Sequence, residues 1–201
     1  MPIKNMLIDL GGVLLEIDID STLQKYRALR APEAGQLDYG KEGQDLWFSK
    51  LDKGEVSIEE FADGLKDSFQ LQASREEIIQ IWADLLKPVF PGRLEAINQL
   101  AAKYNLALLS NTSEYHFGIY EPECRPMFEQ MEHIFTSFEM GVSKPDAAIY
   151  EQAFERSGWK AEETIFLDDS KQNIEGAKAV GLHAFWIETP DHFLKMMEEY
   201  G

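Results

Sequence analysis

The stretch Met6-Leu7-Ile8-Asp9-Leu10-Gly11-Gly12 begins with three apolar residues typical of a buried strand and then places a carboxylate before a glycine pair. A second apolar run, Ile165-Phe166-Leu167, ends in the acids Asp168 and Asp169. A carboxylate at the end of a buried strand costs free energy unless a cation meets it there. The glycines after Asp9 leave backbone room for a metal ion or an oxyanion to approach. The strand ends are therefore predicted to meet a cation.

Five short apolar runs are predicted to form strands, and helical patterns lie between the last four of them. The runs are Ile3 to Ile8, Leu106 to Leu109, Ile134 to Phe138, Thr164 to Leu167 and His183 to Ile187. Alternating strands and helices indicate a parallel sheet covered on both faces, which is an α/β fold. In such sheets ligands bind beyond the carboxyl ends of the strands.

The segment from about Ile19 to Val89 interrupts this alternation, because no convincing strand can be found in it. Two capping-box patterns, Ser57-Ile-Glu-Glu60 and Ser74-Arg-Glu-Glu77, each precede an apolar helical face. We therefore predict a helical cap at 17–89, inserted between core segments at 1–16 and 90–201. An insertion of this length is typical of a functional element, and we expect it to lie over the carboxyl edge of the sheet as a lid.

The composition excludes several classes of partner. The chain has 201 residues, is 44% hydrophobic and carries a formal charge of −17, so its surface repels nucleic acid and anionic membranes. An anionic ligand would need a locally positive pocket made by a metal, a lysine or helix N-termini. Cys124 is the only cysteine, and no segment reaches membrane-spanning length, so a cytoplasmic protein is expected. The oligomeric state stays open.

The predicted strand ends together supply the groups that phosphoryl transfer requires. They offer a carboxylate nucleophile, hydroxyl and amide donors, an ammonium group and an acidic pair, namely Asp9, Ser110, Asn111, Thr112, Lys144, Asp168 and Asp169. Such a reaction needs an in-line nucleophile, donors around the equatorial oxygens and a metal that offsets charge repulsion.

Four motifs resemble, in order and spacing, those of the haloacid dehalogenase-like hydrolase superfamily. They are Asp9-Leu-Gly-Gly-Val-Leu14, Leu108-Leu-Ser-Asn-Thr112, Ser143-Lys-Pro145 and Phe166-Leu-Asp-Asp-Ser170. The resemblance covers essentially the whole chain. It implies a three-layer, Rossmann-like core with an inserted small α-helical cap, and a Mg²⁺-dependent phosphatase. The partner that it implies is a small phosphorylated metabolite, such as a sugar phosphate.

The resemblance also implies a role for each matching residue. Asp9 would take the phosphoryl group as an aspartyl-phosphate, and Ser110 would donate a hydrogen bond to the transferring group. The backbone N–H groups of Asn111 and Thr112 would add to the donors, and Lys144 would neutralise charge.

Magnesium would be held by the Asp9 carboxylate, the Gly11 carbonyl oxygen and Asp169. Asp168 would act through a water molecule or as a support for the ligands. Neighbouring residues at a strand end point in opposite directions, so both acids need not touch the ion.

Gly11 departs from the family pattern, because phosphatases of this superfamily usually carry a second Asp there. That Asp acts as a general acid and base, a contribution of roughly 10²–10⁴-fold. The chain looks similar to a bacterial subgroup that includes a sugar-1-phosphate phosphatase and likewise has glycine at this place. Either an acidified leaving oxygen depends less on protonation, or Glu16, Asp18 or a cap residue acts instead.

Two other functions fit parts of the pattern. A 2-haloacid dehalogenase uses the same nucleophile without a metal and needs an arginine, for which Arg27 and Arg30 are the candidates. A non-catalytic phosphate-binding protein would keep the site without turnover. His116 is expected to pack a helix, and Trp47 and Phe48 are expected to lie in the core of the cap.

Overall fold

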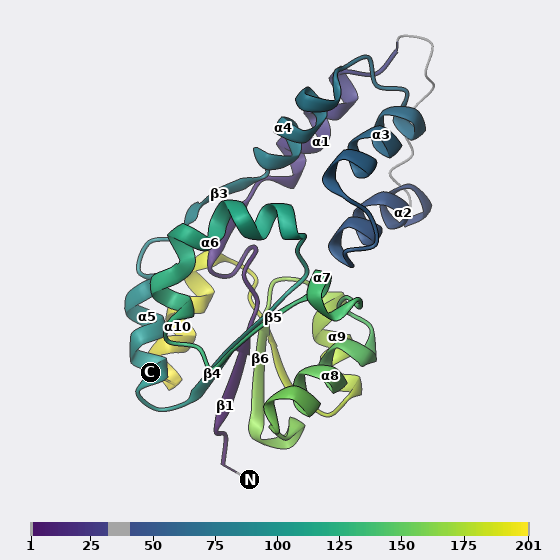
Figure 1. Cartoon of the computed structure of the whole chain (residues 1–201). Coiled ribbons are helices and arrows are strands. Elements are labelled where there is room, and N and C mark those ends of the chain that lie inside the picture. Colours follow the sequence, from purple (N-terminus) through teal and green to yellow (C-terminus); the bar gives the residue numbers. More distant parts are fainter. Residues whose placement is uncertain (1, 32–40, 201) are drawn as a thin grey trace.

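The computed structural model describes residues 2–31 and 41–200 and contains a five-stranded parallel sheet (Figure 1). The strands are β1 (Asn5–Ile8), β4 (Asn105–Ser110), β5 (His133–Thr136), β6 (Thr164–Asp168) and β7 (His183–Trp186). Their order is β5-β4-β1-β6-β7, so the first strand lies at the centre. All five predicted strands are present and the predicted α/β class is confirmed. The third run is shorter than expected, because helix α7 (Ser137–Met140) begins directly after Thr136.

Helices cover both faces of the sheet and give three layers. On one face lie α5 (Arg93–Ala101), α6 (Glu114–Phe128) and α10 (Pro190–Tyr200), and on the other lie α8 (Ala147–Ser157) and α9 (Lys171–Ala179). A short 3₁₀ helix, Ala161–Glu163, precedes β6. Met6 and Ile8 point into the first layer and Leu7 into the second, as the alternation of a strand requires. Cys124 is buried in the first layer, where burial raises the pKa of its thiol to about 12.

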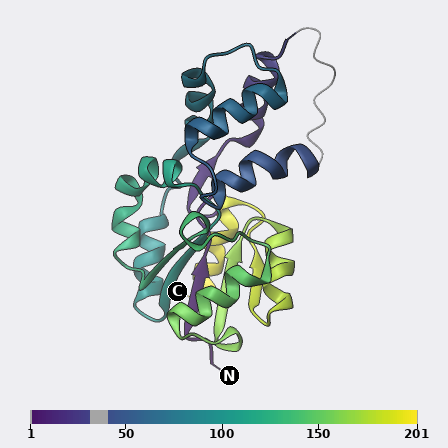
Figure 2. The same cartoon turned by 45° about the vertical axis from the view of Figure 1, so that its right-hand side comes forward.

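Four helices between β1 and β4 form a second, smaller core. They are α1 (Ile19–Ala28), α2 (Lys41–Asp52), α3 (Ile58–Phe69) and α4 (Arg75–Ala83), and we call them the cap. Figures 1 and 2 show the cap beyond the carboxyl edge of the sheet, with α2 packing against α7. The apolar faces predicted for α3 and α4 meet at Phe61, Leu65 and Ile78. The capping box at Ser57 and Glu60 is present, and Ser74 accepts a hydrogen bond from Glu77 N.

One short strand, at residues 86–89, contradicts the expectation that residues 19–89 hold no strand. Strand β2 (Leu15–Ile17) pairs in antiparallel fashion with β3 (Leu86–Val89), and this ribbon connects the cap to the core. Strands of three and four residues are too short to show a periodicity, and Pro88 in β3 argues against a strand when only the sequence is considered. The exact division into core and cap at residues 16 and 89 therefore stays a prediction, with the ribbon spanning both boundaries.

Over the described ranges, no helix combines the length and the apolar character that crossing a membrane would require.

Candidate active site

Asp9 lies one residue beyond the central strand, at the carboxyl edge of the sheet. Ile8 is paired with Leu108 of β4 and Leu167 of β6, and Asp9 N donates to Leu167 O at 2.9 Å. The register therefore brings the ends of β4 and β6 to either side of Asp9. Its side chain is buried, with only 7% of the residue exposed.

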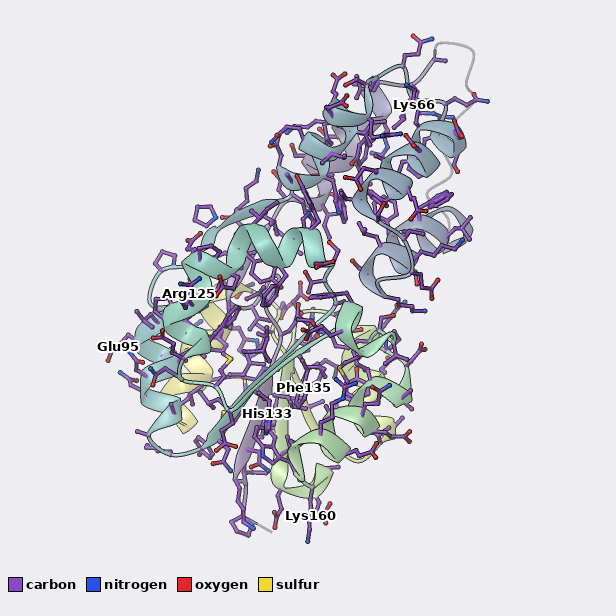
Figure 3. All side chains as sticks on the ribbon, viewed as in Figure 1. Lys66, Glu95, Arg125, His133, Phe135 and Lys160 are labelled. Atoms are coloured by element: carbon purple, nitrogen blue, oxygen red, sulfur yellow. The ribbon has the colours of Figure 1, made fainter. Side chains whose placement is uncertain are left out.

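Lys144 lies at the centre of the site and is buried with it. Its Nζ atom is 2.8 Å from Asp9 Oδ1 and 2.7 Å from Asp168 Oδ2, and it donates to Leu109 O at 2.8 Å. The charged side chains labelled in Figure 3, such as Lys66, Glu95, Arg125 and Lys160, lie on the outer surface instead. Burial removes the water around the lysine ammonium group, which costs free energy. The two carboxylates and the carbonyl oxygen take the place of that water and offset the cost.

Asn111 fixes the position of Lys144 through the backbone. Its side-chain nitrogen donates to Lys144 O at 2.9 Å, and its side-chain oxygen accepts from Lys144 N at 2.8 Å. The backbone N–H of Asn111 is expected from the sequence to be a phosphate donor, and that role stays a prediction. The structure adds a second role for this residue, which is to align the lysine with Asp9.

The two adjacent acids at the end of β6 have different surroundings. Asp168 is fully buried and is held by Lys144, by Ser170 N at 2.8 Å and by Asn173 Nδ2 at 3.0 and 3.1 Å. Asp169 is exposed and lies against Gly12. Oxygen atoms of Asp9, Asp168 and Asp169, the acidic cluster, all lie within 4.8 Å of one another. Asp169 is thus the acid that remains accessible to an ion.

The acidic cluster has more negative charge than Lys144 can balance. Burial raises the pKa of Asp9, and the nearby carboxylates Asp168 and Asp169 raise it further, although Lys144 opposes them. Burial and Asp168 raise the pKa of Asp169 to about 6. Burial alone would lower the pKa of Lys144, but Asp168 and Asp9 raise it. One further cation would therefore favour the ionised forms of Asp9 and Asp169.

The oxygen atoms at this site suit a hard divalent ion. Carboxylate and carbonyl oxygens are the ligands that Mg²⁺ prefers, and it usually keeps several waters, so few protein ligands are needed. A side chain at position 12 would overlap the Asp169 carboxylate, so the glycine leaves room for this acid beside Asp9. Asp9, Asp169 and the Gly11 carbonyl oxygen stay the predicted ligands of Mg²⁺, and the Asp168 carboxylate is already paired with Lys144.

Replacing Gly12 with alanine should therefore damage both the turn and the metal site. Gly12 has φ +71°, a left-handed conformation that costs an L-residue roughly 1–2 kcal/mol, and the new Cβ would push Asp169 away. We expect a lower urea midpoint together with weaker Mg²⁺ binding by calorimetry. Gly118→Ala is the matched control, because a Cβ there meets nothing within 4 Å. Equal effects of the two substitutions would contradict the role given to Gly12.

The position of the missing second acid is closed by the cap ribbon. A Cβ at Gly11 would lie 3.3 Å from Ile17 Cδ1, so the β2 strand occupies this direction. Of the acids proposed as replacements, Asp18 caps α1 by accepting from Ser21 N at 3.0 Å. Glu16 and Asp18 line a cavity of about 500 Å³ that is also lined by Asp169, so they lie near one of the predicted metal ligands.

The structure places the residues expected to act as phosphate donors at the end of β4. Ser110 is buried as the last residue of that strand, and Thr112 lies just beyond it. Thr112 N already donates to Ser137 Oγ at 2.9 Å, and Thr112 Oγ1 accepts from Tyr120 at 3.3 Å. The Thr112 N–H therefore has a protein partner in this structure, and its expected role as a phosphate donor stays a prediction.

Arg93 is a positioning residue that the sequence does not reveal. It is buried between the rings of Phe90 and Phe193, and it donates to Val13 O at 2.8 Å and to Pro190 O at 2.7 Å. It therefore ties the turn after Asp9 to helix α10. In the sequence a cation after Pro-Gly at a helix start resembles a solvated residue, so no local signal could identify it.

His116 packs against the cap rather than against the acidic cluster. Its ring stacks on Trp82 with centroids 4.8 Å apart, and its Nε2 is 2.9 Å from Trp82 O. Burial lowers the pKa of His116 to about 4, so the ring is neutral at pH 7. Phe48 meets Phe61 and Trp82 edge-on, which agrees with the expectation that Phe48 lies in the cap core.

Comparisons with known proteins agree with this geometry. A family model described as haloacid dehalogenase-like hydrolase matches residues 3–181. The D-ribitol-5-phosphate phosphatase of Bacteroides thetaiotaomicron is 30% identical over 192 residues, which is 92% of each chain. The crystal structure of a magnesium complex of a haloacid dehalogenase family enzyme from the same organism superposes with a TM-score of 0.79. It is 28% identical and covers 93% of this chain and 94% of that one.

A haloacid dehalogenase also shares the fold. The L-2-haloacid dehalogenase of Xanthobacter autotrophicus superposes with a TM-score of 0.61 at 17% identity, covering 92% of this chain and 77% of that one. At this identity the likeness extends to the fold alone.

Proposed function

We propose that this chain, which belongs to the haloacid dehalogenase-like hydrolase family and is a phosphatase, uses Mg²⁺ and an aspartyl-phosphate on Asp9 to hydrolyse a small phosphorylated metabolite. The observation that carries this proposal is the buried Asp9 carboxylate at the central strand end. A lysine lies 2.8 Å from it, and two further acids complete a cation site. A carboxylate in these surroundings is a nucleophile for phosphorus.

The residues act in a defined sequence. An Asp9 carboxylate oxygen forms a bond to phosphorus while the bond from phosphorus to the ester oxygen breaks, and the alcohol leaves with a proton from solvent. Water then attacks the aspartyl-phosphate, which releases phosphate and restores Asp9. Lys144 and the Ser110 hydroxyl stabilise the charge on the phosphoryl oxygens. When bound, Mg²⁺ would offset the repulsion between carboxylate and phosphate.

Mg²⁺ should stabilise the protein, and Asp169 should be required for this. A ligand at 100 times its Kd stabilises the folded state by about 2.7 kcal/mol, which corresponds to a Tm increase of roughly 5–10 °C for a chain of this size. We expect this increase in the wild type and not in Asp169→Asn, measured by scanning calorimetry with and without EDTA. Asp67→Asn, at an exposed position on α3, is the control. An unchanged response in Asp169→Asn would exclude this acid as a ligand.

The substrate is proposed to be a sugar phosphate or a sugar-alcohol phosphate. The name of the 30% identical relative, a D-ribitol-5-phosphate phosphatase, supports the second of these. A panel of phosphorylated metabolites, assayed by phosphate release with Mg²⁺, tests the proposal. Metal-independent halide release from 2-haloacids would instead support a dehalogenase, for which Arg30 is poorly placed because its Nε donates to Phe69 O inside the cap. The cytoplasmic location stays a prediction.

A further inference from the structure

A cavity of about 300 Å³ lies between the cap and the loop that follows β4. Phe48, Asp52 and Trp82 of the cap line one side, and Asn111 and Thr112 of the core line the other. We call it the cap cavity. Because Asn111 also holds Lys144, the cavity lies next to the acidic cluster, and its volume suits a small organic group.

Asp52 is the one charged group among the described residues that line the cap cavity. None of those residues is Lys or Arg, and the neighbouring His116 is neutral at pH 7. The Asp52 carboxylate has no hydrogen bond or ion pair with the described residues, and burial raises its pKa to about 7. A second anionic group on the substrate would therefore be repelled here, whereas a hydroxyl could donate to Asp52.

The position of Asp52 is fixed by the core. Its backbone oxygen accepts a hydrogen bond from Ser137 Oγ at 2.5 Å, and the same hydroxyl lies 3.0 Å from Thr112 O and accepts from Thr112 N. Asn111 and Thr112, which directly follow β4, line the same cavity as Asp52. Asp52 is thus held beside the reaction site although it belongs to the cap.

A second lining residue also has an unused polar group. The indole nitrogen of Trp82 is buried and has no hydrogen-bond partner in the described part of the chain. A buried N–H without a partner costs free energy, which a ligand oxygen could recover. The remaining wall is apolar and includes Leu23 and Leu85, which suits the carbon chain of an alcohol.

We propose that Asp52 is a specificity-determining residue that accepts hydrogen bonds from an uncharged, polyhydroxylated leaving group in the cap cavity. This inference rests on the proposed phosphatase function and deepens it. Phosphomonoesters of alditols are selected, and those whose leaving group carries a carboxylate or a second phosphate are rejected. The selection comes from one hydrogen-bond acceptor and from the absence of a cation among the described lining residues.

The test compares two substrates that differ only in hydroxyl groups. A five-carbon alditol phosphate and pentyl phosphate are hydrolysed by wild type and Asp52→Ala, with Asp67→Ala as the exposed control. We expect Asp52→Ala to lower kcat/KM for the alditol phosphate by about 10- to 100-fold, mainly through KM, and to leave pentyl phosphate and an aryl phosphate unchanged. A retained preference for the alditol, or an equal loss with both substrates, would overturn the proposal.

Two further measurements keep this inference separate from the phosphatase proposal. Absence of Mg²⁺-dependent aryl phosphate hydrolysis in the wild type would contradict the phosphatase proposal alone. Calorimetric binding of the alditol phosphate to Asp9→Asn, compared with Asp9→Asn/Asp52→Ala, tests the cavity without turnover. Equal affinities would contradict the role of Asp52. Asp52→Leu, which is similar in shape and has no hydrogen-bond acceptor, serves as the second variant if Asp52→Ala fails to fold, with the same expected results.

Discussion

Replacing Asp9 with asparagine is expected to lower kcat for phosphate release by roughly 10⁴-fold or more, to the level of the background reaction. Asparagine keeps the shape of the side chain but cannot form the aspartyl-phosphate. It also removes one oxygen ligand from the site proposed for Mg²⁺ and the charge that Lys144 faces at 2.8 Å. The measurement is hydrolysis of an aryl phosphate with saturating Mg²⁺.

The loss of activity in Asp9→Asn must be separated from a loss of folding. The substitution removes a carboxylate that burial already disfavours in its charged form, so we expect the Asp9→Asn variant to keep a cooperative unfolding transition. Asp67→Asn should retain full activity, because residue 67 is exposed on the cap. Residual activity of Asp9→Asn within about tenfold of the wild type would rule out covalent catalysis by this residue.

Replacing Lys144 with methionine is expected to cost about 3–5 kcal/mol of stability and to abolish activity. The substitution leaves Asp9 and Asp168 buried without the cation that lies 2.8 and 2.7 Å from them. Removing one partner from a buried ionic network is much more costly than removing a surface charge. Urea unfolding monitored by tryptophan fluorescence gives the free energy of unfolding. Lys160→Met, at an exposed lysine, should change it by less than about 0.5 kcal/mol.

A double-mutant cycle shows whether this cost comes from the unpaired acids. In the Asp9→Asn background one of the two carboxylates is already neutral, so Lys144→Met should cost clearly less there than in the wild type. Additive effects of the two substitutions would mean that Lys144 stabilises the fold without coupling to Asp9. Packing of the lysine stem would then be the main contribution.

The order of the core elements could be predicted because the signals are local. Apolar runs of three or four residues that are followed by Asp9, Ser110 or Asp168 indicate parallel strands, and the helices between them show their own periodicity. The ribbon of β2 and β3 could not be predicted, since its strands are short and one contains Pro88. The two strands of the ribbon pair residues that lie about seventy positions apart in the sequence, and no local pattern predicts such a pairing.

Some features of the candidate site could likewise be predicted from the sequence, and others could not. The sequence alone identified Asp9, Lys144, Asp168 and Asp169, because acids directly after buried strands are unusual and a lysine follows another strand. The preference for Asp169 over Asp168 as the direct ligand came only from the family resemblance. The physical reason for it lies in the folded structure, where Lys144, Ser170 and Asn173 occupy the Asp168 carboxylate. Two adjacent aspartates look the same in a sequence, and only their neighbours in the folded structure distinguish them.

The sequence by itself thus determined which chemistry gathers at the carboxyl edge of the sheet, because strand ends are local features and parallel strands place them together. Only the tertiary structure decided which partner each of these groups has at that edge. The backbone N–H of Thr112 donates to Ser137 Oγ, and Asp52 of the cap lines the cap cavity. Both outcomes depend on contacts between segments at least 25 residues apart, and such contacts are set by packing, not by any local pattern.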